Sequence, residues 1–390
     1  MLIKEGDLMK NDKMQVGIIT LHGYTNYGNK LQNYALQETV NGLGYEVNTI
    51  IIRKSKNSEN VLVRKIKKIF KNSPKKIIEI LSERKKKMTF YENNKELVDD
   101  RTRNFKVFSQ EYLHETFWSD DFDNLSKLDK SYKFFITGSD QVWNPIYINE
   151  MNKYFLTFTA KEKRIAYAAS FSCPDIPDKL KDKYKNWILG MPKISVREKA
   201  GLDIIKDLTG VSVPVLLDPT LLLSKEKWLS ISKKASNRPE GSYILTYFLG
   251  EIDEKTKNYI ESLAKEKSFK IINLADMKDY KSYVTGPSEF IDYINSASVL
   301  FTDSFHGIVF SILMETPFVV YKRIGKSASM YSRIETLLDM FDLRSREVKN
   351  IKNNQQIFDM DLSNVGPILE LERKKALNYL KEALNVKNNF

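Results

Sequence analysis

Apolar runs that end in small or polar residues alternate with helical stretches along most of this 390-residue chain. In residues 15–52, QVGIITL predicts a strand, KLQNYALQETVNGLG a helix that ends at glycine, and YEVNTIII a second strand. This β-α-β order is the unit of doubly wound parallel sheets. The order starts again after the breaker NRPEG, with SYILTYFLG, the helix in DEKTKNYIESLAKEK and the strand in SFKIINLAD. The sequence therefore predicts two strand-first α/β halves, joined near residues 218–241.

The apolar runs outside these two units have the same form and predict further strands. They are YKFFITGSD, KRIAYAASFS, PKISVRE, VSVPVLLDP, SVLFTD and PFVVYKR. We therefore predict an α/β fold class with two Rossmann-like, doubly wound domains that face each other across a cleft. The expected parts are a loose leader at 1–14, a first domain at 15–225 with a basic amphipathic insert at about 53–100, a second domain at 226–365, and a C-terminal helix at 366–390 able to pack back on the first domain.

Cysteine count and hydropathy exclude several classes of protein. The single cysteine, Cys173, rules out an internal disulfide framework and a multi-cysteine zinc site, and we interpret it as a small core residue. No run approaches the roughly eighteen apolar residues of a membrane-spanning helix. The N-terminal stretch MLIKEGDLMKNDKM lacks the apolar core of a signal peptide. We expect a cytoplasmic protein without a metal site.

The positive charge of the chain is concentrated in one segment. Of the formal net charge of +12, residues 53–87 carry +11, from fourteen Lys and Arg against three Glu. Apolar residues in VLVRKIKKIFKNSPKKIIEIL fall at helical spacing between the lysines, which favours contact with an anionic membrane surface. A solvated helix that packs its apolar face on the protein is an equal alternative. Nucleic acid ranks below both, because the segment has few interleaved aromatic residues.

Notable polar residues follow the predicted strand ends, which is where open parallel sheets bind ligands. They are Asn26, Gly28, Ser139, Asp140, Ser170, Arg197, Asp303 and His306. Loops are polar in any case, and Asp, Asn and Ser cap helices, so each small residue also has a structural explanation. Arg197 and His306 are the costlier choices at such positions, and these two are our main candidates.

His306 is expected at the start of a helix through residues 306–315, with Asp303 or Ser304 as the N-cap. A helix N-terminus attracts anions, and histidine exchanges protons near neutral pH. The alternative is a hydrogen-bonded core histidine. Arg197 offers a planar, permanent charge suited to carboxylate or phosphate, and an ion pair with Glu198 is its alternative role.

The loop TGSDQVWNP (137–145) brings together groups suited to a sugar ligand. Its glycine allows close backbone approach, Asp140 can orient or deprotonate a hydroxyl, and Trp143 offers an apolar face for a sugar ring. The loop in GYTNYGNKLQNYALQ is neither a dinucleotide fingerprint nor a Walker A loop. The pair Asp121 and Asp123 has the DxD spacing of metal-dependent sugar transferases. We discount it because no buried strand is predicted before it.

Several of these segments together resemble the polysaccharide pyruvyl transferase family. The matching pieces occur in the family's order over about residues 15–325: TNYGNKLQNYALQ, FFITGSDQVWNP, RIAYAASFS, ISVREKAG, VPVLLDPTLLL and FTDSFHGIVFSILMETPFVVY. The resemblance implies a fold like that of two-domain B-type (GT-B-like) glycosyltransferases, with the active site between the domains. It also implies transfer of the enolpyruvyl unit of phosphoenolpyruvate onto a sugar as a cyclic ketal, with no dissociable cofactor.

The resemblance also implies roles for particular residues. By motif position, Arg197 and His306 are donor-site residues, and Ser304 lies beside them. A family lysine follows the strand after the histidine helix, where YKRIGK offers Lys322, Arg323 and Lys326. Asn29 stands where many relatives have Asp, which argues against an acid–base role at that position.

From residues and resemblance together we expect an enzyme that makes a capsule or exopolysaccharide precursor. His306 is the expected acid or phosphate-side proton donor, and Asp140 is expected to orient or deprotonate the acceptor hydroxyl. A lipid-linked glycan as acceptor gives the basic segment 53–87 a use, as a peripheral contact with the inner face of the plasma membrane. The rival functions are a GT-B glycosyltransferase with a nucleotide-sugar donor, and a non-catalytic glycan- or membrane-binding protein.

Overall fold

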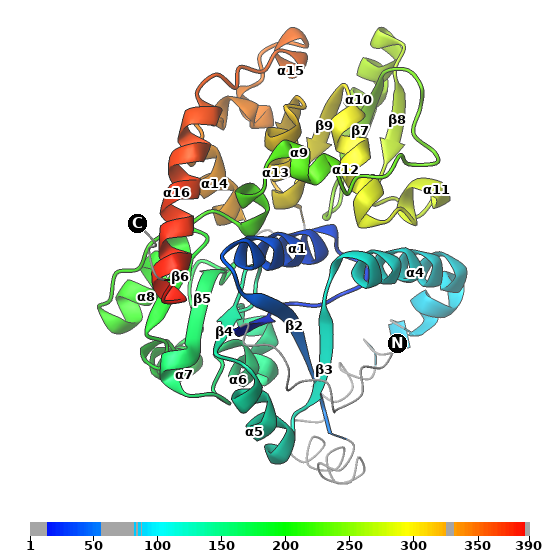
Figure 1. The fold of residues 1–390 in the computed structure, drawn as a ribbon. Coiled ribbons are helices and arrows are strands. Elements are labelled where there is room, and N and C mark those ends of the chain that lie inside the picture. The colour runs from blue at the N-terminus through cyan, green and yellow to red at the C-terminus, as the bar shows by residue number, and fades with distance from the viewer. Residues whose placement is uncertain (1–13, 56–81, 83–84, 87, 325–330, 387–390) are drawn as a thin grey trace.

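Two parallel β-sheets, one above the other, form the framework of the chain (Figure 1). The computed structural model describes residues 14–55, 82, 85–86, 88–324 and 331–386. The first sheet has the order β3-β2-β1-β4-β5-β6 and the second the order β10-β9-β7-β8, with all pairs parallel. The predicted fold class, two doubly wound domains that face each other, is confirmed.

The strands are short and most are buried on both faces, as parallel strands covered by helices must be. Their bounds are β1 Gln15–Ile19, β2 Glu46–Arg53, β3 Glu115–Ser119, β4 Phe134–Thr137, β5 Arg164–Ala169, β6 Lys193–Val196, β7 Tyr243–Tyr247, β8 Lys270–Asn273, β9 Val299–Thr302 and β10 Phe318–Val320.

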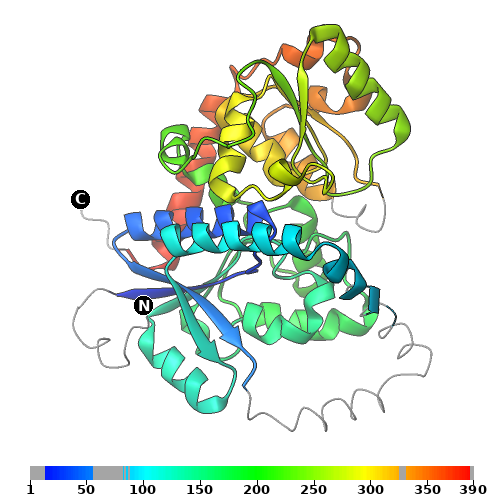
Figure 2. The same ribbon diagram turned by 90° about the vertical axis from the view of Figure 1, so that its right-hand side faces the viewer.

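The helices cover the faces of both sheets (Figure 2). Their bounds are α1 Tyr27–Gly42, α4 Lys95–Tyr112, α5 Phe122–Ser131, α6 Met151–Tyr154, α7 Asp178–Leu189, α8 Lys199–Thr209, α9 Lys225–Leu229, α10 Glu254–Lys267, α11 Tyr280–Tyr283, α12 Pro287–Ser296, α13 Phe305–Met314, α14 Ser332–Met340, α15 Gln355–Phe358 and α16 Val365–Ala383. Among the described helices, none is both long and apolar enough to cross a lipid bilayer.

Helix α1 lies between the two sheets and packs on both. Leu36 and Val40 belong to the core of the first sheet. On the other side, Tyr27 and Leu31 share a core with residues of the second sheet, and the Tyr27 ring stacks on Phe290 with a centroid distance of 4.3 Å. A continuous apolar core therefore joins the two halves.

Helix α16 runs along both sheets (Figure 1). Its N-terminal residues Val365 and Leu369 pack in the core shared with the second sheet, whereas Ala376 and Leu380 pack in the core of the first. The C-terminal helix thus contacts the first sheet. The exact domain boundaries stay predictions.

One prediction about elements is wrong. The run VSVPVLLDP is not a strand: it forms only an isolated bridge between Val215 and Val196, and proline has no N–H to extend the pairing. The edge strand β3 precedes the Asp121-Phe122-Asp123 triplet, but none of its residues is buried, in line with the expectation that no buried strand lies there. Asp121 caps α5 by accepting the N–H of Asn124 at 3.0 Å. The triplet is therefore a helix start. Most of the basic insert, residues 56–81, lies outside the described residues.

Candidate functional site

One pocket lies where the topological switch points of both sheets meet. The strand order of the first sheet reverses between β1 and β4, and that of the second between β7 and β9. Crevices outside the carboxyl ends of strands at such points are the usual ligand sites of open sheets. The segments after these four strands, with Arg323 and Arg333, line a pocket of about 200 Å³. Its residues are Asn26, Gly28, Asp140, Gln141, Ile146, Tyr147, Tyr247, Leu249, Ser304, Phe305, His306, Arg323 and Arg333.

His306 lies in the first turn of α13, held by contacts from both sheets. The hydroxyl of Ser304 caps the helix by accepting the N–H of Gly307 at 3.3 Å. The His306 Nε2 atom lies 3.7 Å from Oδ2 of Asp218 and makes no hydrogen bond. On the other edge of the ring, a Cβ on Gly28 would lie 2.0 Å from Nδ1. Only glycine at the start of α1 leaves room for the imidazole.

Two buried arginines lie beside the histidine. Nη1 of Arg197 is 2.5 Å from Oδ2 of Asp218, and its Nη2 is 3.5 Å from Oδ1 of Asp140. Nη1 of Arg333 reaches the same Asp140 oxygen at 3.9 Å. The Phe305 ring contacts both guanidinium groups, with centroid distances of 4.7 Å to Arg197 and 5.7 Å to Arg333. Asp140 therefore lies between two cations that come from different halves of the chain.

The two arginines differ in how well their charge is compensated. Burial would lower the pKa of Arg197, but the carboxylates of Asp218 and Asp140 offset this effect, and the pKa is raised. Burial and the neighbouring Arg197 lower the pKa of Arg333 to about 10. Among the described residues, Nε has no hydrogen-bond partner in either arginine, and Arg333, only 6% exposed, has one ion pair, with Asp140 at 3.9 Å. An anion in the pocket would supply the missing negative charge.

Asp218 connects the histidine to Arg197. Burial alone would raise the pKa of its carboxyl. The nearby imidazole of His306 and the charge of Arg197 instead hold the pKa well below its usual range. Thr220 also donates its hydroxyl to Oδ1 at 2.6 Å. The carboxylate stays ionised and orients the Arg197 guanidinium.

The sequence over residues 26–323 matches the family model described as polysaccharide pyruvyl transferase. The chain belongs to this family. No curated protein matches it. Among solved structures, UDP-GlcNAc 2-epimerase from Neisseria meningitidis is 8% identical, with a TM-score of 0.46, over 95% of this chain and 100% of that one. A glycosyltransferase from Rickettsia africae is 12% identical, with a TM-score of 0.44, over 97% and 100%.

In this pyruvyl transferase family member, part of the predicted site lines the pocket. The residues that do are Asn26, Gly28, Asp140, Ser304, His306 and Arg323. Arg197 is not among them: its buried guanidinium pairs with Asp218 and lies 3.5 Å from Asp140. Asn29 does not line the pocket either, and its amide donates to the Asp140 carboxylate. Lys322 is exposed, with its ammonium 5.1 Å from the Tyr331 ring centroid.

Other predicted site residues face the protein interior. Trp143 is fully buried, stacked on Phe155 with a centroid distance of 4.7 Å, so its predicted role as a sugar platform is wrong. The buried hydroxyl of Ser139 donates to Asp218, and that of Ser170 to Glu198. Both hold neighbouring loops together.

Asp303 has a structural role as well. Its carboxylate accepts backbone N–H groups of Leu249 and Gly250 at 2.7 and 2.8 Å, and it pairs with Arg323 at 3.0 Å. It therefore fixes the loop after β7 and the pocket-lining Arg323. Lys326 lies outside the described residues.

Sequence reasoning missed Asp218 and Arg333. Asp218 ends the apolar run VPVLLD, so the polar-after-apolar signal used for the other residues was present. Arg333 had no such signal, because it lies in helix α14 with no strand before it.

Cys173 is half-buried beside an apolar cluster of the first half of the chain. Burial, with the nearby Glu198, raises the pKa of its thiol to about 12, which keeps the thiol protonated.

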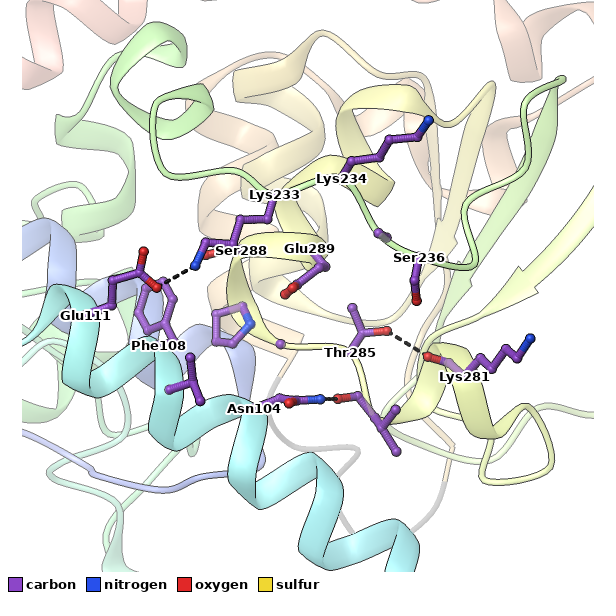
Figure 3. A pocket seen from close by; sticks show the side chains of 15 residues that line it. Asn104, Phe108, Glu111, Lys233, Lys234, Ser236, Lys281, Thr285, Ser288 and Glu289 are labelled. Atoms are coloured by element: carbon purple, nitrogen blue, oxygen red, sulfur yellow. Dashed lines mark hydrogen bonds and ion pairs between the residues drawn. The ribbon is translucent and has the colours of Figure 1, made fainter.

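A separate pocket of about 200 Å³ lies between α4 and the start of α12 (Figure 3). It contains contacts that join the two halves: Lys233 pairs with Glu111 at 2.5 Å, and the Asn104 amide donates to the Val284 carbonyl at 2.7 Å. None of the predicted site residues lines it. Within the described parts of the chain, no three His, Cys, Asp or Glu residues are grouped so that they could hold a metal ion.

Proposed function

We propose that this enzyme transfers the enolpyruvyl unit of phosphoenolpyruvate onto two hydroxyls of a sugar in a cell-surface polysaccharide precursor, such as a capsule or exopolysaccharide. Family membership supports a transferase. The observation that supports the donor is the buried, undercompensated guanidinium of Arg333 beside His306 at the meeting of the two switch points. Phosphoenolpyruvate carries a carboxylate and a phosphate, which are the partners that such a guanidinium prefers.

In this proposal Arg333, Arg323 and the first turn of α13 bind the anionic donor. Asp218 and Arg197 act through their neighbours as positioning residues. Both oxygens of Asp140 already accept hydrogen bonds, from Asn29 and from the backbone N–H of Gln141, and Oδ1 also lies near two guanidinium groups. This occupancy supports an anchoring role for Asp140 over the base role we first expected.

His306 is the proposed acid. A proton is added to C3 of the enol, which becomes a methyl group, while the first sugar hydroxyl attacks C2 and loses its proton. The bond between C2 and the phosphate oxygen then breaks, and phosphate leaves with that oxygen. The second hydroxyl adds to C2, loses its proton and closes the ketal. The two hydroxyl protons balance the one added to C3 and the one gained by the phosphate.

The test is phosphate release from phosphoenolpyruvate in the presence of candidate lipid-linked saccharides, together with the mass gain of a pyruvate ketal. We expect His306→Gln to lower turnover by about 10²–10⁴-fold, the usual contribution of a general acid. The control is His114→Gln, which changes an exposed histidine. Nucleotide release from a nucleotide sugar, without phosphate release from phosphoenolpyruvate, would instead identify a glycosyltransferase.

We also propose that the enzyme works on the cytoplasmic side of the membrane, on a lipid-linked acceptor. The basic segment 53–87 then supplies a peripheral contact with anionic lipids, because its lysines alternate with apolar residues at helical spacing.

A further inference from the structure

A larger pocket, of about 670 Å³, lies beside the candidate site at the carboxyl edge of the first sheet. It is formed by the ends of β2 and β3 and by the segment after β4, and it lies within the range of volumes typical of ligand sites. None of the residues that we assigned to the donor lines it. A pyruvyl transferase must hold a second substrate, so this pocket needs an explanation.

The two pockets are lined by neighbouring residues of the same two loops. In the loop after β1, His22 lines the large pocket and Asn26 lines the candidate site. In the turn Pro145–Glu150, Asn149 lines the large pocket, whereas Ile146 lines the candidate site. One extended ligand can therefore place its reacting end near His306 and the rest of its length in the large pocket.

The lining of the large pocket is positively charged. Arg53 and Lys54 contribute two cations beside the carboxylate of Asp120, whose Oδ1 accepts the backbone N–H of Ser55 at 2.6 Å. The Arg53 guanidinium lies over the Phe117 ring, at 3.9 Å from its centroid. Stacking of this kind limits the freedom of the side chain and favours a fixed charge at the pocket rim.

The remaining lining fits a sugar. Asn149 and Asn152 supply amides that can both donate and accept hydrogen bonds, as sugar hydroxyls require. Phe158 and Leu125 supply apolar surface. A pocket with amides, apolar surface and excess positive charge suits a saccharide that also carries a phosphate ester.

We infer that the large pocket binds the part of the acceptor remote from the ketal, a saccharide phosphate, with Arg53 and Lys54 contacting the phosphate. The part of this inference that identifies the ligand as the acceptor rests on the proposed function. The existence of the binding site does not depend on turnover.

The test compares glucose, galactose and mannose 1-phosphates with the matching free sugars, in the wild-type chain and in the double variant Arg53→Gln/Lys54→Gln. We expect the variant to bind the sugar phosphates about tenfold more weakly by calorimetry, the effect of losing charged contacts to one phosphate. Its affinity for the free sugars and its KM for phosphoenolpyruvate should stay unchanged. The matched control is Lys265→Gln/Lys374→Gln, which removes the same charge at two exposed lysines elsewhere.

The outcomes separate this inference from the proposed function. If ketal transfer occurs but the Arg53/Lys54 variant binds sugar phosphates like the wild type, the pocket assignment is wrong and the function stands. If no transfer occurs with any acceptor but the variant loses sugar-phosphate affinity, the pocket assignment stands and the function is wrong. A glucosyl diphosphate bearing a short isoprenyl chain, compared with UDP-glucose, then distinguishes a lipid-linked source of the phosphate from a nucleotide-linked one.

Discussion

At the residue scale, Gly28 has only a hydrogen where other residues have Cβ, and this leaves room for the His306 ring. A methyl group there would lie 2.0 Å from Nδ1, so the imidazole would have to move. We expect Gly28→Ala to lower turnover by about 10²-fold, since a displacement of about 1 Å in a catalytic group has effects of that size. Steady-state kinetics of phosphate release would measure it.

Gly42→Ala is the matched control for this change. Gly42 ends the same helix, and a Cβ there meets nothing within 4 Å. We expect it to leave turnover unchanged and to alter the free energy of unfolding by no more than about 0.5 kcal/mol. Equal activity of the two variants would contradict the position that we assign to His306.

Asp218 gives the site a dependence on pH that can be measured as stability. The pKa of its carboxyl is held below the usual range in the folded chain. The contribution of this carboxylate to the free energy of unfolding is therefore complete above the unfolded-state pKa of about 4, and it is lost progressively as the pH falls below that value. Asp218→Asn leaves Arg197 buried with less compensation. We expect the free energy of unfolding at pH 7 to drop by about 3 kcal/mol.

Urea denaturation over a series of pH values would test this expectation. The difference between the wild type and Asp218→Asn should narrow on acidification below about pH 4. Asp182→Asn, at an exposed position, is the control and should have little effect. A constant difference from pH 7 to pH 3 would show that Asp218 is not the stabilising charge.

At the element scale, local pattern predicts the buried strands and fails at the edge of the sheet. The first β-α-β unit was predictable because β1 and β2 are apolar runs covered on both faces. Strand β3 was missed because it pairs only with β2 and is half-exposed, with Phe117 51% exposed, so charged and polar residues surround it. Its pairing depends on a neighbour more than sixty residues away in the chain.

The candidate site shows the same division. Residues that directly follow central strands, such as Asp140 and His306, were predictable because parallel strands bring their carboxyl ends to one edge. Trp143 follows the same strand as Asp140, and nothing in the sequence tells that its side chain turns inward onto Phe155. Arg333 reaches the pocket from α14, and only the packing of that helix places it there.

The basic insert is an element whose role can be tested directly. We expect deletion of residues 58–87 to reduce co-sedimentation with vesicles that contain anionic lipid, since each basic residue near such a surface contributes about 1 kcal/mol. Binding by the intact chain should weaken as salt is added. Vesicles of neutral lipid are the control.

The alternative role of the insert predicts a different result. If its apolar face packs on the protein, the deletion should leave vesicle binding undiminished and should lower the free energy of unfolding. Vesicle binding by the intact chain that is insensitive to salt would also contradict the electrostatic contact.

At the scale of the whole molecule, the two halves are joined by polar contacts as well as by the shared core. Arg101 in α4 donates to the Thr25 carbonyl at 2.9 Å and to the Tyr27 hydroxyl at 3.1 Å, and it also bonds to the Tyr283 carbonyl of the second half. Tyr27 in turn donates to the Thr285 carbonyl at 3.0 Å. Because both sheets contribute to the pocket, this junction also fixes the distance between His306 and the loops of the first sheet.

We therefore expect the chain to unfold as one cooperative unit, although a chain with two sheets could unfold in two separate steps. Calorimetry should show a single transition, with equal calorimetric and van't Hoff enthalpies.

The substitution Arg101→Leu removes the hydrogen bonds to Thr25 and Tyr283 and leaves buried acceptors unpaired, which should lower the free energy of unfolding by about 2 kcal/mol or more. It should split or broaden the transition and lower turnover. Arg103→Leu, on the same helix with its side chain 68% exposed, should change neither. Two transitions in the wild type would mean that the halves are not coupled. Identical behaviour of the two variants would mean that the apolar core alone couples the halves, and that Arg101 does not set the geometry of the pocket.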